Sequence, residues 1–264
     1  MTRLPTLHGR GVTPNPCNRF ERITLERDPG TVAEDPAPRT EFFRNSSRSI
    51  ISRNSSPDVG FDASINPYRG CEHGCAYCYA RPTHEYLGLS AGLDFESKIF
   101  IKQDAPELLR NELSSPRWRP QLLALSGITD PYQPIERTAR ITRGCLEVLT
   151  EFRNPVMMIT KNFLVTRDLD LLAELASHRA VKVAVSVTTL DPALQRVMEP
   201  RTSSPKRRLD AIERLAQAGV PVTVFLAPLI PGLNDHEISS ISSWPRRREA
   251  PQKRAAFRCA SAMA

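Results

Sequence analysis

Short apolar runs alternate with amphipathic segments along the middle of the chain, from Phe61 to about Ala227. The runs are aliphatic or β-branched and three to eight residues long, which is typical of buried strands. We therefore expect strands at Ile99–Ile101, Leu122–Leu125, Val156–Ile159, Val181–Val187 and Val220–Ala227.

Segments with helical periodicity separate these runs. Apolar residues recur in them at helical spacing, which predicts one face packed against a core. The sets are Leu108, Leu109 and Leu113 after a cap at Asp104; Cys145, Leu149 and Phe152; Leu169, Ala173 and Ala176; and Leu209, Ile212 and Leu215 between a Ser204-Pro205 start and a Gly219 stop. Strands that alternate with helices predict βαβ units and a parallel sheet, either open or closed into a barrel.

The two ends lack this pattern. Residues 1–60 are rich in Pro, Arg, Asn and Ser, and we expect an extended, partly disordered leader there. Residues 61–238 form the predicted core domain. Residues 239–264 show no sustained period and consist largely of Arg, Ala, Ser and Pro, so we expect a disordered basic tail.

Composition and charge place the chain among ordinary globular proteins, with 40% hydrophobic and 25% charged residues. Its longest apolar stretches, such as Val220–Ile230, are shorter than the roughly 20 residues of a membrane helix, and no secretory signal is visible. We expect a cytoplasmic protein. Six of the 36 Lys and Arg residues but one of the 29 acidic residues lie in the tail, so the net charge of +7 is weak support for nucleic-acid binding.

The strongest chemical signal is a cysteine loop at residues 69–78, RGCEHGCAYC. Cys71, Cys75 and Cys78 can turn their sulfur atoms toward one inorganic group, and Gly70 and Gly74 allow the loop to fold tightly. Thiolates are the usual ligands of iron–sulfur clusters, and a cubane cluster normally takes four. The cysteine loop supplies three, which leaves one iron open to a non-protein ligand.

A structural zinc site is the alternative for the cysteine loop, with His73 or His84 as the fourth ligand. Structural zinc sites usually take their ligands as two separated pairs, and the sequence contains no second CxxC. The spacing therefore favours an iron–sulfur cluster over zinc.

The cysteine loop resembles the CxxxCxxC signature of radical S-adenosylmethionine (SAM) enzymes, including an aromatic residue, Tyr77, before the third cysteine. The resemblance extends to the branch that contains spore photoproduct lyase and DNA-repair-photolyase-like proteins, and it covers roughly residues 40–236. The segments that carry it are NPYRGCEHGCAYCYARPTHEY (66–86), KIFIKQDAPELLRNEL (98–113), GITDPYQPIE (127–136), MITKN (158–162), SVTTLD (186–191) and FLAPLIPGLND (225–235).

This resemblance implies an α/β fold, a partial (β/α)6 TIM-like barrel of the radical SAM type, with the cysteine loop after a first strand near Asp62–Asn66. It implies a [4Fe–4S] cluster on Cys71, Cys75 and Cys78, with SAM as the second cofactor and an electron donor such as flavodoxin or ferredoxin. The reaction implied is reductive cleavage of SAM and hydrogen abstraction from a substrate that the sequence does not identify.

The resemblance also implies which strand-end residues contact SAM. Tyr77 would lie against the adenine, Thr129 and Asp130 near the methionyl ammonium, Lys161 near the carboxylate or a ribose hydroxyl, and Ser186 and Thr188 near the ribose; Arg201 is a looser candidate. The stretch around Asp130 replaces the GGEP sequence of many radical SAM enzymes. Each polar residue has a structural alternative as a strand-end cap or turn former, and Tyr77 as a core aromatic.

The remaining cysteines are not expected to be cluster ligands. Cys145 has the helical spacing of a buried apolar residue. Spore photoproduct lyases place a hydrogen-donor cysteine near the end of the second strand, where this chain has SGIT at 126–129 and no thiol. That difference counts against photoproduct repair. Cys17 and Cys259 remain unassigned.

The resemblance stops after residues 230–236, IPGLNDH, where relatives continue with a helix and a sixth strand. The sixth strand is therefore expected to be missing, as in a truncated or frameshifted reading frame. Two function classes stay open: a radical SAM enzyme, whose activity truncation would impair, and a non-catalytic metal- or cluster-binding fragment.

Overall fold

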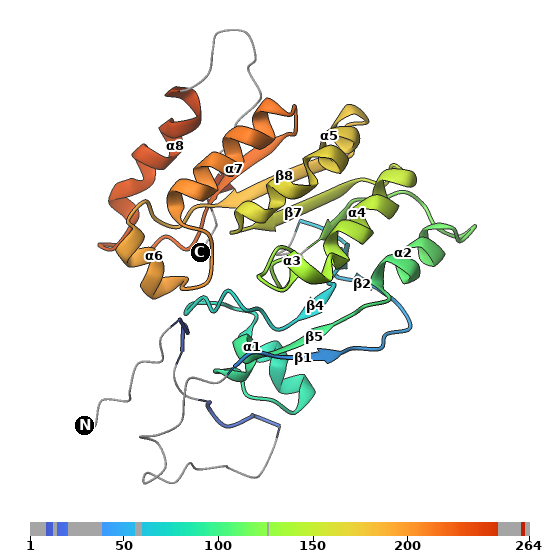
Figure 1. Cartoon of the computed structure of the whole chain (residues 1–264), viewed down its shortest axis with the longest axis horizontal. Coiled ribbons are helices and arrows are strands. Elements are labelled where there is room, and N and C mark those ends of the chain that lie inside the picture. Colours follow the sequence, from blue (N-terminus) through green and yellow to red (C-terminus); the bar gives the residue numbers. More distant parts are fainter. Residues whose placement is uncertain are drawn as a thin grey trace.

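A central sheet organises the computed structural model, which describes residues 9–12, 15–20, 39–55, 60–125, 127–247 and 260–261 (Figure 1). Its strand order is β10-β9-β8-β7-β6-β3-β2, and all neighbours are parallel except β2 and β3. The strands are β2 (Ile51–Arg53), β3 (Ala63–Ile65), β6 (Leu123–Leu125), β7 (Val156–Thr160), β8 (Val181–Ser186), β9 (Val222–Leu226) and β10 (Ala260–Ser261).

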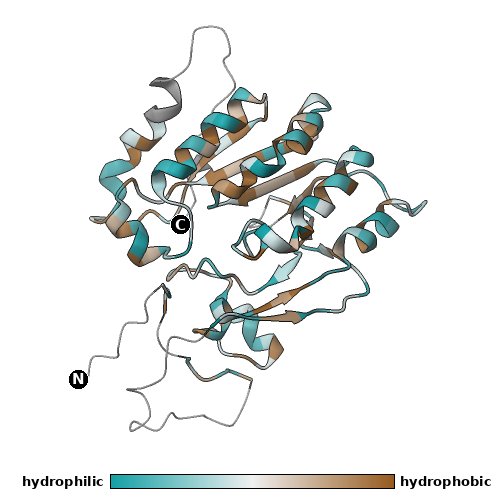
Figure 2. Cartoon of the chain, in the orientation of Figure 1, coloured by the Kyte–Doolittle hydropathy of each residue, from teal (hydrophilic) through white to brown (hydrophobic). Residues whose placement is uncertain are grey.

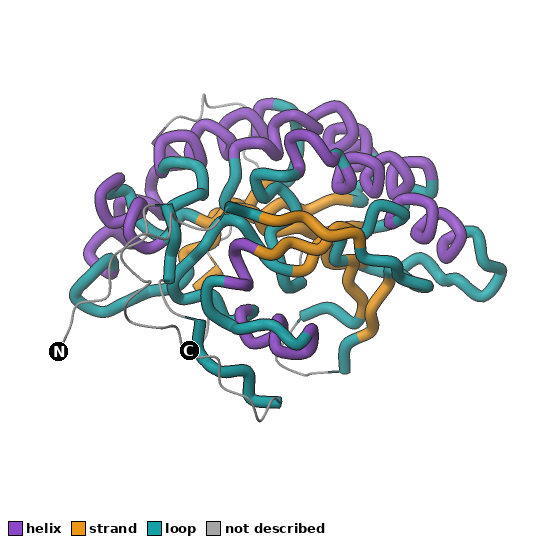
Figure 3. The backbone as a smooth tube through the Cα atoms, turned by 60° about the horizontal axis from the view of Figure 1, so that its bottom comes forward, coloured by secondary structure: helices purple, strands orange, loops and turns teal. Residues whose placement is uncertain are grey.

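A layer of helices covers one face of this curved sheet (Figure 3). The longer helices are α2 (Ala105–Leu113), α4 (Ile141–Glu151), α5 (Leu169–Ser177), α7 (Pro205–Gln217) and α8 (Ile238–Arg247). Shorter elements are α1 (Asp94–Ser97), α3 (Glu136–Ala139), α6 (Pro192–Met198), η1 (Arg81–Leu87), η2 (Phe163–Asp168) and η3 (Asp235–Glu237). None of the helices in the described residues is long and apolar enough to span a membrane.

Apolar residues of the sheet and of the covering helices form one core cluster, as the periodicity predicts. Figure 2 shows the central strands largely in brown, which marks hydrophobic residues, and the helices in mixed colours. Val183 and Val185 of β8 are fully buried, and Leu209, Ile212 and Leu215 of α7 belong to the same core cluster. The α/β class and the alternation of strands and helices are confirmed. Among the described strands β2 and β10 form the two edges, so the sheet is a curved, partial barrel.

One predicted strand belongs to another sheet. Residues 98–101 form β5 (Lys98–Ile101), which pairs with β1 (Glu41–Arg44) and β4 (Tyr68–Arg69) in a three-stranded sheet. After β3 the chain adds β4 and β5 to this small sheet, forms α2, and returns to β6, which pairs directly with β3. Apolar periodicity identifies a strand but not its partner, so the sequence placed Ile99–Ile101 in the main sheet.

Part of the expected leader is ordered strand. β1 and β2 both lie within residues 1–60, and Ile50 beside β2 is buried in the main core. Phe43 of β1 stacks on Phe100 of β5, with 5.1 Å between ring centroids. These paired apolar residues explain why β1 and β2 join the fold. Residues 1–8, 13–14, 21–38 and 56–59 of the expected leader lie outside the described residues.

The expected tail also contains regular structure. Residues 238–247 form α8, although we expected no helix after Ser239. Ile241 is buried in the main core and attaches this Ser-rich segment to it. The two-residue β10 pairs in parallel with β9, at the place left open for a sixth strand. The rest of the expected tail, 248–259 and 262–264, lies outside the described residues.

Asp104 is a smaller correction. Helix α2 begins at Ala105, as the sequence predicts, but the Asp104 side chain does not cap it. Its carboxylate instead accepts hydrogen bonds from Arg44, at 3.1 and 3.2 Å. Arg44 of β1 competes with the backbone N–H groups of α2 for the Asp104 carboxylate. The carboxylate therefore ties α2 to β1.

Candidate functional site

The cysteine loop follows β3 and β4 and lies largely inside the molecule. Cys71 and Cys75 are buried and Cys78 is half-buried, and Cys71 and Cys78 pack with Ala80 and Phe95. Tight turns shape the cysteine loop: the Cys78 N–H donates to the Cys75 carbonyl at 3.2 Å. The sequence therefore folds these three thiols into one protected loop.

Electrostatics in the loop favour a bound cation. Burial raises the pKa of Cys71, and the negative charges of Asp130, Cys75 and Cys78 raise it further. Burial raises the pKa of Cys75 to about 12, although Lys161 counteracts part of the effect. Each thiolate charge would raise the pKa of its neighbours. A metal centre that supplies positive charge would lower these pKa values and convert the thiols to thiolate ligands.

In the part of the chain that the structure describes, no three His, Cys, Asp or Glu side chains are close enough together to hold a metal ion. Metal binding therefore requires the cysteine loop to draw its sulfur atoms closer together. The donor set fits an iron–sulfur cluster, because it offers three thiols from one short loop, two of them packed against Ala80 and Phe95. Of the histidines of the zinc alternative, His73 contacts Asp130 and Asn162. His84 contacts the Lys98 carbonyl through Nε2, and its buried Nδ1 has no hydrogen-bond partner among the described residues.

Arg81 and Glu96 support the cysteine loop from one side. The Arg81 guanidinium donates twice to the Cys75 carbonyl, at 3.2 and 2.9 Å, and contacts Glu96 at 3.4 Å. Glu96 is fully buried and also accepts hydrogen bonds from the backbone N–H groups of Gly11 and Val12, at 3.1 and 3.2 Å. One carboxylate thus joins residues 9–12 to the loop.

Gly11 and Gly74 make a close backbone contact at this point. A Cβ atom on Gly11 would lie 1.6 Å from the Gly74 carbonyl oxygen, and one on Gly74 would lie 2.1 Å from the Glu96 carboxylate. Gly74 also has a φ of +64°, which favours glycine. No larger side chain fits either position without movement of the cysteine loop.

Glu72 fixes the other side of the cysteine loop. Its N–H donates to Gln133, at 2.9 Å, and its carboxylate accepts from the Ile135 N–H at 2.7 Å. The same carboxylate pairs with Arg201 at 3.1 Å. Arg201, the looser candidate for a cofactor contact, therefore has a structural partner in the loop itself.

Asp130 connects the ends of two strands. Its carboxylate accepts hydrogen bonds from Thr160 at 2.8 Å and from the Lys161 N–H at 2.7 Å, and it lies 3.3 Å from His73 Nδ1. Burial alone would raise the pKa of Asp130, but His73 and the backbone N–H groups of Lys161 and Tyr132 outweigh it and lower the pKa. Asp130 therefore remains a carboxylate, beside the cysteine loop.

Thr129, the neighbour of Asp130, has a structural bond. Its hydroxyl donates to the Tyr68 carbonyl at 3.2 Å, and the side chain is buried. This bond ties the turn after β6 to β4, which is the strand-end role that the sequence left open as the alternative for Thr129.

Four of the six expected SAM-contact residues meet in one network around Glu199. Lys161 donates to the Ser186 hydroxyl at 2.6 Å and pairs with Glu199 at 3.2 Å. Tyr77 and Thr188 both donate to the same carboxylate, Thr188 at 2.7 Å. The Lys161 ammonium also lies 5.5 Å from the centroid of the Tyr77 ring. Residues from the loop, β7, β8 and the segment after α6 are thus brought together.

Sequence reasoning missed Glu199 and its partner Arg208. Arg208 is buried and forms an ion pair with Glu199, and it donates to the carbonyls of Ser203 and Ser186, at 2.8 and 3.0 Å. The signal was present, because Arg208 lies four residues before Ile212 on the buried face of α7. A charged residue on an apolar face requires a buried partner.

Comparison with known proteins gives the chain a family context. Residues 65–244 match a family model described as the Radical SAM superfamily. An uncharacterized protein of Mycobacterium tuberculosis is 42% identical over 175 residues, covering 66% of this chain and 52% of that protein. A radical SAM Nalpha-GlyT isomerase of Pseudomonas phage M6 is 28% identical over 173 residues, covering 65% of this chain and 34% of the isomerase.

Among solved structures, a spore photoproduct lyase variant superimposes with a TM-score of 0.59 and 18% identity, covering 83% of this chain and 60% of the lyase. At this identity the likeness shows the fold. The chain spans about half the length, 52%, of the mycobacterial relative that it matches.

Proposed function

Because the chain belongs to the radical SAM superfamily, we propose that it is an enzyme that holds a [4Fe–4S] cluster on Cys71, Cys75 and Cys78 and cleaves SAM reductively. One observation carries this proposal. The three buried or half-buried thiols follow the first parallel strand, and the polar ends of β6, β7 and β8 lie beside them. In parallel sheets the carboxyl ends of the strands are where ligand sites form.

When bound, the cluster would supply one electron to SAM, whose cleavage to methionine would supply a 5′-deoxyadenosyl radical for hydrogen abstraction from the substrate. The chain's own residues bind the cluster and SAM and orient them. We assign Cys71, Cys75 and Cys78 to the cluster, since a cubane cluster then keeps one iron open for SAM. Ala80 and Phe95 pack against Cys71 and Cys78 and shield these two thiols in part from water.

We assign Tyr77, Lys161, Ser186 and Thr188 to SAM, with Tyr77 toward the adenine and the polar groups toward carboxylate and ribose. Support comes from the Glu199 network, which holds all four side chains in fixed positions before any ligand binds.

Thr129 and Asp130 are the proposed partners of the methionyl ammonium. Asp130 keeps its negative charge, as a cation partner must. An ammonium group would share its oxygens with Thr160 and the Lys161 N–H. The electron would come from a small donor such as flavodoxin or ferredoxin in a reducing cytoplasm. Because residues 127–129 contain no thiol, we propose a substrate other than the spore photoproduct.

Anaerobic reconstitution with iron and sulfide tests the proposal. We expect about four irons and four sulfides per chain, with the broad absorption of a cubane cluster. Replacement of Cys71, Cys75 or Cys78 by Ala should abolish it. Cys145→Ala is the matched control, because Cys145 is buried in α4 away from the cysteine loop. Uptake of one zinc and no sulfide would exclude the proposed function, as would a reduced cluster that yields no 5′-deoxyadenosine from SAM.

A further inference from the structure

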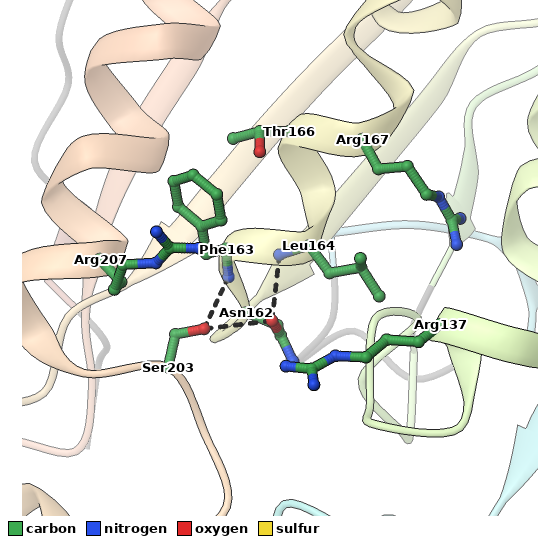
Figure 4. A pocket seen from close by; sticks show the side chains of 8 residues that line it. All are labelled: Arg137, Asn162, Phe163, Leu164, Thr166, Arg167, Ser203 and Arg207. Atoms are coloured by element: carbon green, nitrogen blue, oxygen red, sulfur yellow. Dashed lines mark hydrogen bonds between the residues drawn. The ribbon is translucent and has the colours of Figure 1, made fainter.

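A pocket of about 510 Å³ lies beside η2 and adjoins the cysteine loop through Asn162, which contacts His73 at 3.3 Å (Figure 4). Small-molecule sites usually have volumes of about 300–1,000 Å³. The pocket walls come from α3, from the turn and helix that follow β7, and from the start of α7. The lining residues are Arg137, Asn162, Phe163, Leu164, Thr166, Arg167, Ser203 and Arg207. None of them is a cysteine of the loop or an expected SAM contact.

The lining is positively charged. It contains three arginines and no acidic residue. Arg167 is neutralised by Glu136 and Asp168, at 2.7 and 2.8 Å. Arg137 and Arg207 form no ion pair with any described residue. The first turn of α7, which carries Arg207, contains no acidic side chain either. Two positive charges of the pocket are therefore uncompensated within the described chain.

The two uncompensated arginines face a common floor. Figure 4 shows Arg137 reaching toward Asn162 from one side of the pocket, and Arg207 lying against the Phe163 ring on the other side. The guanidinium carbon of Arg207 lies 3.6 Å from the centroid of the Phe163 ring. Such stacking holds the guanidinium in place and leaves its N–H donors at the edge of the ring.

The floor itself is rigid and internally bonded. Ser203 accepts a hydrogen bond from the Phe163 N–H at 2.8 Å and donates to Asn162 at 3.1 Å. The same Asn162 oxygen accepts from the Leu164 N–H at 3.0 Å. The oxygen acceptors of the floor are thus satisfied from within, and the arginine donors remain for a ligand.

We propose that this pocket binds a phosphomonoester through Arg137 and Arg207. A phosphomonoester carries close to two negative charges at neutral pH, which matches two uncompensated arginines. The fork of N–H donors on arginine suits the oxygens of phosphate. The volume exceeds that of phosphate alone, and the side chain of Leu164 offers apolar surface for the organic part of the ligand, while Arg207 and Arg214 lie over the Phe163 ring.

Titration calorimetry on the full chain tests this site, with phenyl phosphate as the probe and benzenesulfonate, which carries one charge, as the matched control ligand. Phenyl phosphate should bind saturably with one equivalent, and binding should weaken as the ionic strength rises from about 0.01 to 0.15 M. Inorganic phosphate should bind more weakly, because it lacks the apolar group. Benzenesulfonate binding of equal affinity would overturn the proposal.

Arg137→Gln and Arg207→Gln should each weaken phenyl phosphate binding about tenfold. Arg137 has no ion pair to lose, so its variant should unfold at the wild-type temperature. Arg119→Gln is the matched control, since Arg119 is exposed, bonds only to backbone carbonyls and does not line the pocket. Unchanged binding in Arg137→Gln, an equal loss in Arg119→Gln, or binding of a short oligonucleotide without phenyl phosphate binding would each refute the proposal.

Discussion

Lys161 and Glu199 form a largely buried ion pair, with 3.2 Å between the ammonium nitrogen and the carboxylate oxygen. The pair joins the end of β7 to the segment after α6, and Arg208 approaches the same carboxylate from α7. Two cations around one fully buried carboxylate satisfy its charge without water. The proposed SAM-facing side chains therefore depend on Glu199 for their positions.

Glu199→Gln should destabilise the protein strongly. The substitution leaves Arg208 buried without a countercharge, and the loss of one partner of a buried pair costs about 3–5 kcal/mol. The free energy of unfolding in urea measures the effect. Glu174→Gln, at an exposed position of α5, should change this free energy by less than about 0.5 kcal/mol. A loss below about 1 kcal/mol in Glu199→Gln would show that the network is not a structural centre.

Glu199 should also make the free energy of unfolding depend on pH in the acidic range. Burial alone would raise the pKa of Glu199, but Lys161 and Arg208 outweigh it and lower the pKa from 4.5 to about 2. A lowered carboxyl pKa gives stability that is complete above about pH 4.5 and is lost as the pH falls toward about 2. Between about pH 6 and 3 the wild type should lose about 2 kcal/mol more than Glu199→Gln. Parallel urea titrations at both pH values measure this difference, and equal losses would contradict it.

The strand ends and the cysteine loop could be predicted from the sequence, because both depend on local patterns. Strand β8 ends at Ser186 and β7 at Thr160, close to where the apolar runs stop. The support of the cysteine loop could not be predicted. Glu96 accepts a hydrogen bond from the Gly11 N–H, 85 residues away. No local sequence pattern around either residue predicts this contact.

From the sequence, Asp130 was predicted to contact a ligand, and its partners within the protein were not predicted. His73 and Thr160 come from two other segments, and only the folded chain brings them to this carboxylate. Ile241 was missed for a different reason. Ile238, Ile241 and Trp244 recur every three residues, but this run is short and lies among Ser and Arg, so it does not stand out as a helical period; Ile241 is nevertheless buried.

Gly74→Ala should destabilise the cysteine loop more than an ordinary glycine substitution. A left-handed backbone costs a non-glycine residue about 1–2 kcal/mol. The new Cβ would also lie 2.1 Å from the Glu96 carboxylate, which Arg81 and the Gly11 N–H hold in place. We expect a total loss of about 3 kcal/mol or more, with a lower yield of reconstituted iron.

Gly219→Ala is the matched control for Gly74→Ala. Gly219 has a φ of +76°, and no atom lies within 4 Å of the place that an added Cβ would take, so only the backbone cost applies. Thermal unfolding of both variants separates the cost of the left-handed backbone from the cost of the contact between the new Cβ and Glu96. Equal destabilisation would mean that Glu96 moves aside and does not fix the cysteine loop.

Ile241→Ala should reveal whether the segment after Ser239 belongs to the fold. Ile241 is 1% exposed and packs in the main core, so its truncation should cost about 2–4 kcal/mol of unfolding free energy. Ile238→Ala is the matched control, because Ile238 is 37% exposed and should lose less than about 1 kcal/mol. A chain that ends at Glu237 should be destabilised at least as much as Ile241→Ala, since it lacks the whole of α8. If Ile241→Ala and the shortened chain both unfold like the wild type, α8 contributes nothing to the core and the segment is the tail that its composition predicts.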